Sequence, residues 1–451
     1  MSASDGASGP GASDAIALPS ACDLLVRDAL VLIGDSAATP PFFGWVAVVG
    51  DRISAVGTGS APVRLKAVRT VDGAGCALVP GFVNTHAHSH SSLTRGSAEG
   101  LALAEWIATI EREQALLSDD DAYVAALATY GELLLSGTTT VLDMCLRPGP
   151  ALRAAREIGI RAIVAPYVLD GRAFAPTLAD VAGLLERECV PGDRTAVWVG
   201  LHDLESCADE TVREGAALAR RFNTGIHLHC AESRGNVART RERTGASPIA
   251  HLDALGALGP MTVLAHCVWA DADDIQLLAE RGTSVAHCPH ANLKLGSGIA
   301  PVSAMRAAGV RVSLATDGAK ANNRLDLFDV MKFASLLHKG ATFDPGVLAP
   351  ADVMAMATRD GAAALGVPAG EIAVGRLADL TLIDLRRFHL QPATPETVTT
   401  NLVHAARGSD VHTTIVGGEV VVEGGRLTRV DETAVLAAMR DSAAALLEAS
   451  R

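Results

Sequence analysis

Eight short apolar runs recur through the middle of this chain, and segments with helical periodicity separate them. The runs are Leu78–Val83, Thr139–Asp143, Arg161–Tyr167, Ala196–His202, Gly225–Cys230, Thr262–His266, Thr283–His287 and Arg311–Thr316. The helical segments include Asp121–Leu135, Ala151–Ile158, Thr211–Arg221 and Asp273–Arg281. Buried strands that alternate with helices are typical of parallel sheets covered by helices. The pattern predicts a (β/α)8 TIM-like barrel. A doubly wound open sheet is the alternative, but the first run lacks the Gly-rich phosphate loop that such a sheet would favour.

Both ends of the chain follow a different sequence pattern, in which Gly, Pro and Asp separate short β-type runs. The pattern covers about Cys22–Asp72 and returns in Ala378–Asp384 and Thr413–Val422. We therefore expect a small β-sandwich domain built from residues 22–79 and 372–430, around a barrel of residues 80–371. Residues 431–451 are predicted to form a C-terminal helix. Residues 1–21 are expected to be a disordered leader, because they have neither the basic start nor the apolar core of a signal peptide.

Composition narrows the class of protein and its partners. The chain has 451 residues and a formal net charge of −13, so neither nucleic acid nor an anionic membrane surface is expected as its main partner. It contains no run of 18 apolar residues that would predict a membrane span. Eight cysteines are scattered without a C-x-x-C pair, which favours a reducing cytoplasm.

Polar side chains gather where the predicted strands end. His86 and His88 end the first run, and because side chains two residues apart on a strand share a face, both rings can reach one ion. Later runs end in His227-Leu-His229, His266, His287 and Thr316-Asp317. In a barrel, the carboxyl ends of the strands converge on one face, where catalytic residues lie. The joint arrangement predicts a metal site.

The types of residue indicate the chemistry of that site. Three imidazoles and one carboxylate suit a borderline divalent ion, Zn²⁺ above all, with Fe²⁺ or Mn²⁺ possible. An open position on the ion would hold water and lower its pKa towards neutrality. Glu232 lies just past the strand that ends at His229, where it could hand a proton to a substrate nitrogen, and Asp317 could take one from the water.

Several motifs give the chain a specific resemblance that covers about residues 22–430. They are Pro80-Gly-Phe-Val-Asn-Thr-His-Ala-His88, His229-Cys-Ala-Glu232, Leu264-Ala-His-Cys-Val268, Asn292-Leu-Lys-Leu-Gly-Ser-Gly-Ile-Ala-Pro301, Thr316-Asp-Gly318 and Gly375-Arg-Leu-Ala-Asp-Leu380. The chain resembles metal-dependent amidohydrolases, in the branch of S-adenosylhomocysteine/methylthioadenosine deaminases, guanine and cytosine deaminases and triazine hydrolases. The resemblance implies that Glu232 is a proton shuttle, that His266 contacts the attacking water or the tetrahedral intermediate, and that the metal ligands are His86, His88, His229 and Asp317.

An absence refines this expectation. No lysine occurs between Lys66 and Lys294, whereas dihydroorotase- and urease-like relatives bridge two metals with a modified lysine on the fourth strand. The fourth run here, Ala196–His202, cannot supply that bridge. We therefore expect a single divalent metal per chain.

The resemblance and the retained carboxylates favour one reaction over two alternatives. We expect removal of an exocyclic amine from an N-heterocycle with release of ammonia, because that departure needs an acid such as Glu232 near the metal. A triazine-type hydrolase that releases chloride or an alkylamine is the alternative within the same class. A non-catalytic assembly protein is a more remote one, since such relatives lose ligands that this chain keeps. The resemblance also implies a homo-oligomer acting on a small heterocyclic substrate.

Substrate contacts are predicted at six positions. His202 ends the fourth run, and Trp106 lies in the segment after the first strand that would cover the pocket. Adenosine-type relatives grip the ribose hydroxyls with a glutamate slightly further on, where Glu113 and Gln114 are the candidates and the count lands nearer Gln114. The other two predicted contacts are His90 and His290, which would make the pocket polar. A smaller ring such as a pterin, an oxidised purine or a triazine therefore competes with an adenine nucleoside.

Overall fold

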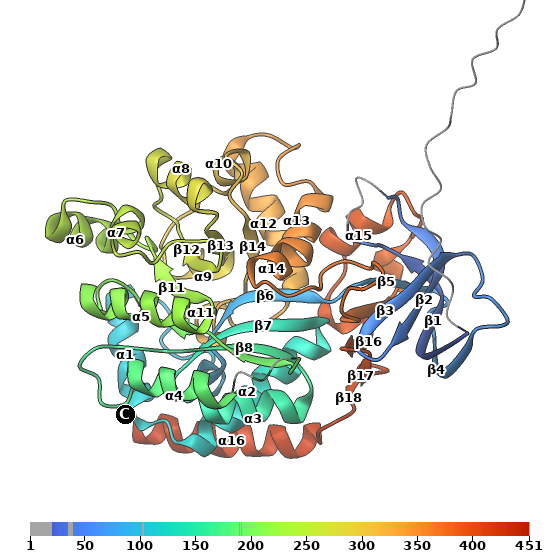
Figure 1. Ribbon diagram of the computed structural model, residues 1–451, viewed down its shortest axis with the longest axis horizontal. Helices are drawn as coiled ribbons and strands as arrows, with labels where there is room; N and C mark the ends of the chain where they lie inside the picture. The colour runs from blue at the N-terminus through green and yellow to red at the C-terminus, as the bar shows by residue number, and fades with distance from the viewer. Residues whose placement is uncertain (1–19, 35–38, 102, 189, 191, 451) are drawn as a thin grey trace, which may run out of the picture.

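The computed structural model describes residues 20–34, 39–101, 103–188, 190 and 192–450 (Figure 1). The predicted leader, residues 1–21, lies outside the described residues except for its last two positions. The protein has a mixed α/β architecture, with two parallel sheets flanked by helices and one larger sheet at the side of the molecule. No helix in the described part of the chain is long and apolar enough to cross a bilayer.

The central strands form two parallel sheets whose order follows the sequence. One sheet contains β6 (Phe82–Ala87), β7 (Thr138–Cys145), β8 (Arg161–Pro166) and β9 (Thr195–Val197). The other contains β10 (Val199–Gly200), β11 (Ile226–Cys230), β12 (Thr262–His266), β13 (Ser284–His287) and β14 (Val312–Leu314). Each predicted apolar run contains at least part of one of these strands. The first run is divided, because its Leu78–Pro80 portion belongs to a strand of the larger sheet.

Helices connect these strands and cover their outer faces (Figure 1). The N-terminal ones are α1 (Leu103–Leu116), α2 (Asp119–Leu135), α3 (Pro148–Ile158), α4 (Leu178–Glu188) and α5 (Asp209–Phe222). They are followed by α6 (Arg234–Thr244), α7 (Pro248–Ala254), α8 (Ala272–Arg281), α9 (Pro289–Lys294), α10 (Val302–Ala307), α11 (Ala319–Asn322), α12 (Leu327–Thr342), α13 (Pro350–Ala357), α14 (Arg359–Ala364), α15 (Val398–His404) and α16 (Glu432–Ala449). Helix α2 begins two residues before its predicted start, because the Ser118 hydroxyl accepts a hydrogen bond from the backbone of Asp121 at 3.1 Å.

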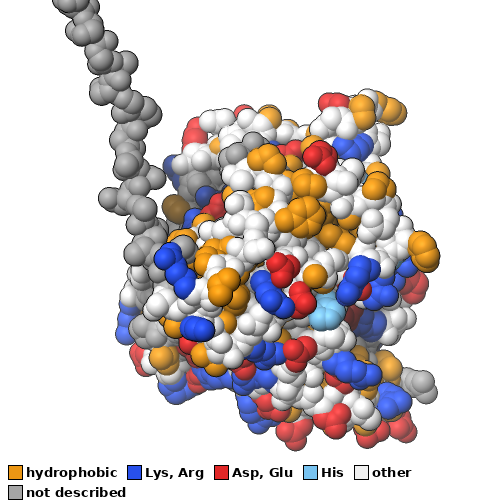
Figure 2. All heavy atoms as spheres, turned by 90° about the vertical axis from the view of Figure 1, so that its right-hand side faces the viewer, with side chains coloured by type: hydrophobic (Ala, Val, Ile, Leu, Met, Phe, Trp, Pro, Cys, Tyr) orange, Lys and Arg blue, Asp and Glu red, His pale blue; other side chains and the backbone are white. Residues whose placement is uncertain are grey.

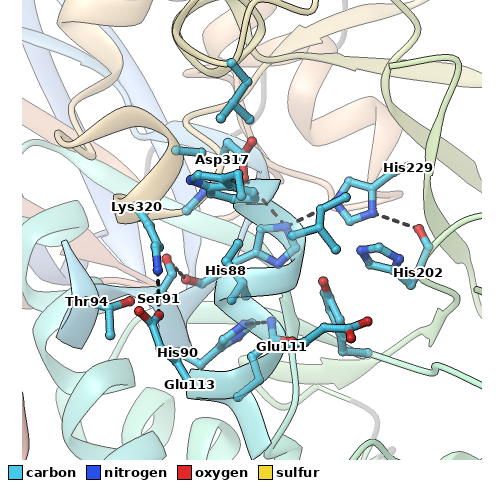
Figure 3. Close-up of a pocket in the computed structure, with 18 of the residues that line it drawn as sticks. His88, His90, Ser91, Thr94, Glu111, Glu113, His202, His229, Asp317 and Lys320 are labelled. Carbon is cyan, nitrogen blue, oxygen red and sulfur yellow. Dashed lines mark hydrogen bonds and ion pairs between the residues drawn. The ribbon is translucent and has the colours of Figure 1, made fainter. Parts of the chain in front are cut away.

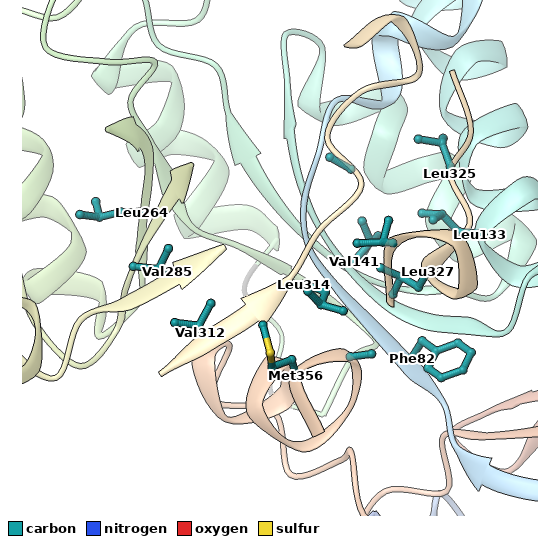
Figure 4. Close-up of a cluster of buried hydrophobic side chains, with 14 of the residues drawn as sticks. Phe82, Leu133, Val141, Leu264, Val285, Val312, Leu314, Leu325, Leu327 and Met356 are labelled. Atoms are coloured by element: carbon teal, nitrogen blue, oxygen red, sulfur yellow. The ribbon is translucent and has the colours of Figure 1, made fainter. Parts of the chain in front are cut away.

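Buried polar bonds join the first central strand to the segment that follows the last one. The backbone N–H of Asp317 donates to the carbonyl of His86 at 3.0 Å, and the Asn84 amide donates to the Thr316 hydroxyl at 2.7 Å. Below these bonds, Phe82, Val141, Leu314 and Leu327 belong to one apolar cluster shared by both parallel sheets and α12 (Figure 4). The carboxyl ends of β6 and β14 are therefore held next to each other.

The larger sheet is assembled from both ends of the chain. Its nine strands are β1 (Ala21–Val31), β2 (Phe42–Val49), β3 (Arg52–Thr58), β4 (Lys66–Asp72), β5 (Cys76–Pro80), β15 (Leu380–Asp384), β16 (Val411–Val416), β17 (Glu419–Glu423) and β18 (Arg426–Leu427). Strand β5 joins the two halves, because it pairs with both β1 and β15. Hydrogen bonding connects all nine as one sheet, and the predicted two-layer sandwich stays a prediction. Figure 2 shows this side of the molecule, where charges of both signs are interspersed with apolar groups.

A buried ion pair ties the larger sheet to the parallel strands. The Arg161 guanidinium at the start of β8 donates to both carboxylate oxygens of Asp379, at 2.8 and 3.1 Å. The same carboxylate accepts a hydrogen bond from the backbone of Gly417 at 2.6 Å. These contacts fix the position of the larger sheet relative to the base of the parallel strands.

Candidate functional site

The predicted ligand His86 belongs to a relay of hydrogen bonds that fixes its tautomer. The Nδ1 atom of His227 lies 2.8 Å from the carbonyl oxygen of Val263, so it must carry the proton and leave Nε2 of His227 as an acceptor. Nδ1 of His86 donates to that acceptor across 2.7 Å. Nε2 of His86 is therefore unprotonated, and it is buried without a hydrogen-bond partner. A buried lone pair of this kind is costly unless it binds a cation.

Three more histidines are oriented in the same way. Nδ1 of His88 donates to the Met144 carbonyl at 2.7 Å, and Nδ1 of His229 donates to the His202 carbonyl at 2.7 Å. His266 donates from Nδ1 to the side-chain oxygen of Asn292 at 2.8 Å. Each Nε2 atom is thus a bare acceptor, the form in which imidazole binds a metal.

These bare nitrogens converge with one carboxylate. The Nε2 atoms of His88 and His229 lie 3.1 Å apart, and Oδ1 of Asp317 lies 3.7 Å from Nε2 of His86 and 3.6 Å from Nε2 of His88. The ligand atoms of His86, His229 and His266 also lie within 4.8 Å of one another. Nitrogen donors plus one carboxylate match the ligands that Zn²⁺ prefers. The donor set fits a divalent metal, and the orphaned Nε2 atom of His86 is the observation that supports this fit.

The local backbone at the site is constrained. His266 and Asp317 both have positive φ angles, +73° and +62°, which non-glycine residues rarely adopt. Such strain persists only where surrounding contacts fix the conformation, and it is concentrated at functional sites. The backbone of Gly318 donates to Oδ1 of Asp317 at 2.5 Å, and burial raises the pKa of this carboxyl to about 6.

Glu232 and His202 border the converging nitrogens. A carboxylate oxygen of Glu232 lies 4.0 Å from Nε2 of His266 and faces the cavity. His202 hydrogen-bonds to the Ser206 hydroxyl at 2.8 Å and lies 3.2 Å from the Asp203 carboxylate. Although burial opposes the charged imidazole, Asp203 raises the pKa of His202. The site therefore combines a carboxylate beside the metal position with an imidazole that is paired with a second carboxylate.

A cavity opens over the metal position, and five of the six predicted substrate contacts line it (Figure 3). They are His90, Trp106, Glu113, Gln114 and His202. The Gln114 amide donates to Nε2 of His90 at 3.2 Å, which leaves Nδ1–H of His90 as a buried donor without a partner. The indole N–H of Trp106 is likewise buried and unpartnered. Two N–H groups of cavity-lining residues are therefore buried without a hydrogen-bond partner.

The sixth predicted contact, His290, is not among the residues that line this cavity. It lies on α9, where its ring stacks on Phe333 with 4.3 Å between the ring centroids. Position along the chain alone could not show that the ring of His290 packs against Phe333.

Lys320 and Tyr167 are among the cavity residues that were not predicted from the sequence. Lys320 is 1% exposed and donates to the Glu113 carboxylate at 2.6 Å (Figure 3). The ring of Tyr167 lies 5.6 Å from that of His88 and 4.6 Å from that of His202, measured between centroids. The one signal for Lys320 was its place three residues after Asp317, and Tyr167 ended the third apolar run without a metal-ligating group.

Comparison with known proteins assigns the class. Residues 77–421 match the amidohydrolase family. The chain is 39% identical over 412 residues to a 5′-deoxyadenosine deaminase of Methanothermobacter thermautotrophicus. The aligned residues cover 89% of this chain and 95% of that protein. It is 38% identical to a 5-methylthioadenosine/S-adenosylhomocysteine deaminase of Syntrophobacter fumaroxidans, over 93% of this chain and 98% of the relative.

Solved structures agree with this assignment. An adenosine deaminase from Xanthomonas campestris with bound zinc superposes with a TM-score of 0.90 at 30% identity, covering 95% of this chain and all of the other. An atrazine chlorohydrolase from Arthrobacter aurescens, complexed with zinc, superposes with a TM-score of 0.87 at 23% identity over 93% of this chain and 100% of the other, which shows a shared fold.

The chain therefore belongs to the amidohydrolase family. It is an enzyme of that family, as the motifs around His86, Glu232 and Asp317 predicted. The alternative of a non-catalytic assembly protein is not supported, because the relatives are enzymes and the ligand-type residues of this chain converge.

Proposed function

We propose that this enzyme hydrolyses the exocyclic amine of an adenine nucleoside and releases ammonia, using one divalent ion, most simply Zn²⁺. The proposal rests above all on the convergence of bare Nε2 atoms from His86, His88 and His229 with the Asp317 carboxylate. Zinc is supported by this donor set and by its presence in a structure similar over the whole chain. A single ion is supported by the fourth strand, which contains no lysine that could bridge a second.

The residues around the ion have separate roles in this proposal. When bound, a divalent ion supplies Lewis acidity and lowers the pKa of its water. The Asp317 carboxylate, whose oxygen lies among the converging Nε2 atoms, accepts a proton from the attacking water. Glu232 carries a proton to the ring nitrogen and to the departing amine, and His266 accepts a hydrogen bond from the oxygen that adds to the ring. The 4.0 Å distance between the Glu232 carboxylate and Nε2 of His266 supports roles for both groups at the same reacting centre.

The cavity favours a nucleoside over a smaller ring. Glu113 lines the cavity, and although its Oε2 accepts from Lys320, its second carboxylate oxygen could accept hydrogen bonds from sugar hydroxyls, whereas the amide of its neighbour Gln114 is bonded to His90. The position of His290 outside the cavity removes one of the two reasons for expecting a small polar heterocycle. The nucleoside named for the two deaminase relatives supports the same choice.

We also propose that the two parallel sheets form one closed (β/α)8 barrel. The bonds between Asn84 and Thr316 support closure on one side, and a parallel bridge between Val168 and Leu201 supports it on the other. The domain limits that fit this architecture are residues 22–79 with 372–430 for the β-domain, 80–371 for the barrel and 431–451 for the C-terminal helix. A homo-oligomer in the cytoplasm is part of the proposal, and the seven described cysteines, all free and buried, are compatible with a reducing compartment.

An ammonia-release screen tests the reaction. Purified enzyme with its metal quantified would be incubated with adenosine, 5′-deoxyadenosine, methylthioadenosine, guanine, a pterin, cytosine and an aminotriazine. We expect ammonia from the adenine nucleosides and a matching loss of adenine absorbance. Ammonia from the other rings alone would contradict the nucleoside assignment. Release of chloride or alkylamine from a triazine, with no ammonia from any substrate, would favour the triazine-type alternative.

A further inference from the structure

The C-terminal helix α16 reaches the cavity although it lies beyond the residues that match the family, 77–421. It runs along α2, and its last turns lie beside α1, the helix that carries the cavity residues Trp106, Glu113 and Gln114 (Figure 1). Asp431 caps its start by accepting a hydrogen bond from the backbone of Thr433 at 2.9 Å. The helix is therefore anchored at one end and inserted towards the site at the other.

One side chain makes this insertion. Leu446 is 5% exposed and is the single fully buried residue of α16, while Met439 and Ala443 pack more loosely on the same stripe of the helix. The spacing of these three residues, i, i+4 and i+7, is that of one helix face. Leu446 belongs both to the apolar cluster around Tyr167 and to the lining of the cavity.

The cavity has an apolar end at this place. Leu117 from the end of α1 and Leu169 from the loop after β8 line the cavity with Leu446, and all three share the cluster that contains Tyr167. Tyr167 in turn contacts His88 and His202, so its ring separates the apolar end from the metal position. A substrate whose amine lies at the metal can therefore extend past Tyr167 towards Leu446.

The charges of the cavity lining also restrict which substituents a substrate can carry. Among the described residues that line the cavity, Lys320 is the one Lys or Arg side chain, and Glu113 pairs with it at 2.6 Å. The nearby Arg172 guanidinium is held by Glu111 at 3.1 Å. The remaining lining carboxylates would repel an anionic substituent, and a carboxylate at the apolar end would meet no free cation within the described lining.

We propose that α16 is part of the substrate site and that Leu446 is a specificity-determining residue. It closes the apolar end of the cavity and selects nucleosides that carry a short, uncharged, apolar substituent on the sugar at the end remote from the base. This inference rests on the proposed deamination of adenine nucleosides and defines which of them the site accepts.

Steady-state kinetics of size variants test the inference. Leu446→Phe should lower kcat/KM for methylthioadenosine by about tenfold or more, mainly through KM, while adenosine changes by less than about twofold. Leu446→Ala should raise kcat/KM for a longer alkylthio analogue, butylthioadenosine, relative to methylthioadenosine. Leu436→Ala is the matched control, because Leu436 lies on the same helix with 55% of its surface exposed. Thermal unfolding and metal content would be measured for each variant.

The possible results distinguish the role of Leu446 from the proposed deaminase function. If the wild-type enzyme deaminates adenosine and methylthioadenosine but neither Leu446 variant changes their ratio, the role of Leu446 is overturned and the proposed function stands. Turnover of S-adenosylhomocysteine by the wild type as efficient as that of methylthioadenosine would overturn the selection for an uncharged substituent. No turnover of any adenine nucleoside would overturn the proposed function, and the inference with it.

Discussion

The Nε2 atoms of His88 and His229 lie 3.1 Å apart, yet no proton can lie between them, because each ring donates its Nδ1–H to a backbone carbonyl. Two lone pairs at this distance repel, and burial lowers the pKa of both rings well below the usual value, so protonation does not relieve the contact. A cation bound by both nitrogens would relieve this repulsion. Assembly of the site and binding of a divalent ion are therefore coupled.

Metal removal should consequently destabilise the folded protein. We expect about one divalent ion per chain, a lower unfolding temperature after treatment with a chelator, and recovery on addition of Zn²⁺, because a ligand at a thousandfold excess over its Kd contributes about 4 kcal/mol. His229→Gln should abolish most of this metal dependence, whereas His412→Gln, on β16 in the larger sheet, should keep it. Elemental analysis with two tightly bound ions per chain would contradict the single-ion site.

Replacing Glu232 by Gln should remove the proton carrier without removing the metal. The amide keeps the shape of the side chain but cannot exchange a proton, so we expect ammonia release to fall by about 100- to 10,000-fold with metal content unchanged. Glu242→Gln on the exposed face of α6 is the matched control and should retain full activity. Near-normal turnover by the Glu232 variant would show that another group carries the proton.

The His227 relay should matter for metal affinity although its ring does not reach the converging nitrogens. Because His227 accepts the Nδ1 proton of His86, its replacement by Leu frees the His86 ring to change tautomer and rotate. We expect metal affinity to fall by about 10- to 100-fold, measured by competition with a chelator. His338→Leu removes another buried histidine, one that bonds to His287, and serves as the control. Equal losses in both variants would point to general destabilisation instead.

The strands and the gathering of polar side chains at their ends could be predicted for physical reasons. Buried parallel strands need continuous apolar runs, and their carboxyl ends must gather at one edge, so the approach of His86, His229 and Asp317 to one another could be expected from their places. Their roles as metal ligands were implied by the family resemblance and stay a prediction. The start of the first strand could not be predicted, because Leu78–Pro80 and Phe82–Val83 lie in one continuous apolar run. Only pairing with Leu380–Leu382 assigns Leu78–Pro80 to the larger sheet.

The cavity residues depended on orientations that spacing does not contain. Glu113 and Gln114 are adjacent on α1, and neighbouring helical residues point about 100° apart, so a count along the chain could not show how either side chain is placed. The structure gives the two side chains different partners, since Lys320 binds Glu113 and Gln114 binds His90. Leu446 lies more than 300 residues from these positions, and nothing in local sequence links it to the cavity.

The Lys320–Glu113 pair should be sensitive to the loss of either partner. Lys320→Met leaves the Glu113 carboxylate buried without a cation, and we expect a loss of about 3–5 kcal/mol in the free energy of unfolding and a raised KM for adenosine. The double variant Lys320→Met/Glu113→Leu should be less destabilised than the two single changes together. Arg324→Met breaks a solvent-exposed pair with Asp329 and should cost less than about 1 kcal/mol. Denaturant unfolding of the four variants measures these losses. If the loss in the double variant equalled the sum of the two single losses, Lys320 and Glu113 would not be coupled and the prediction would be wrong.

Acid should destabilise the protein through buried histidines that cannot be charged in the folded state. Burial lowers the pKa of His338 from 6.5 to about 4, so the unfolded chain takes up this proton first as the pH falls. The stabilising contribution is fully present above pH 6.5 and is lost as the pH falls to about 4. Because a tenfold difference in proton affinity is worth about 1.4 kcal/mol, the loss amounts to at most about 3.5 kcal/mol.

His338→Gln should therefore flatten the dependence of the unfolding free energy on pH between 6.5 and 4. The variant loses its bond to Nε2 of His287, and measurement at pH 8 isolates that cost because neither state is protonated there. Denaturant unfolding in the presence of a chelator keeps metal release out of the comparison. We expect the gap between wild type and variant to narrow as the pH falls. A gap that stays constant from pH 8 to pH 4 would mean that His338 takes up its proton equally well in the folded and unfolded chains.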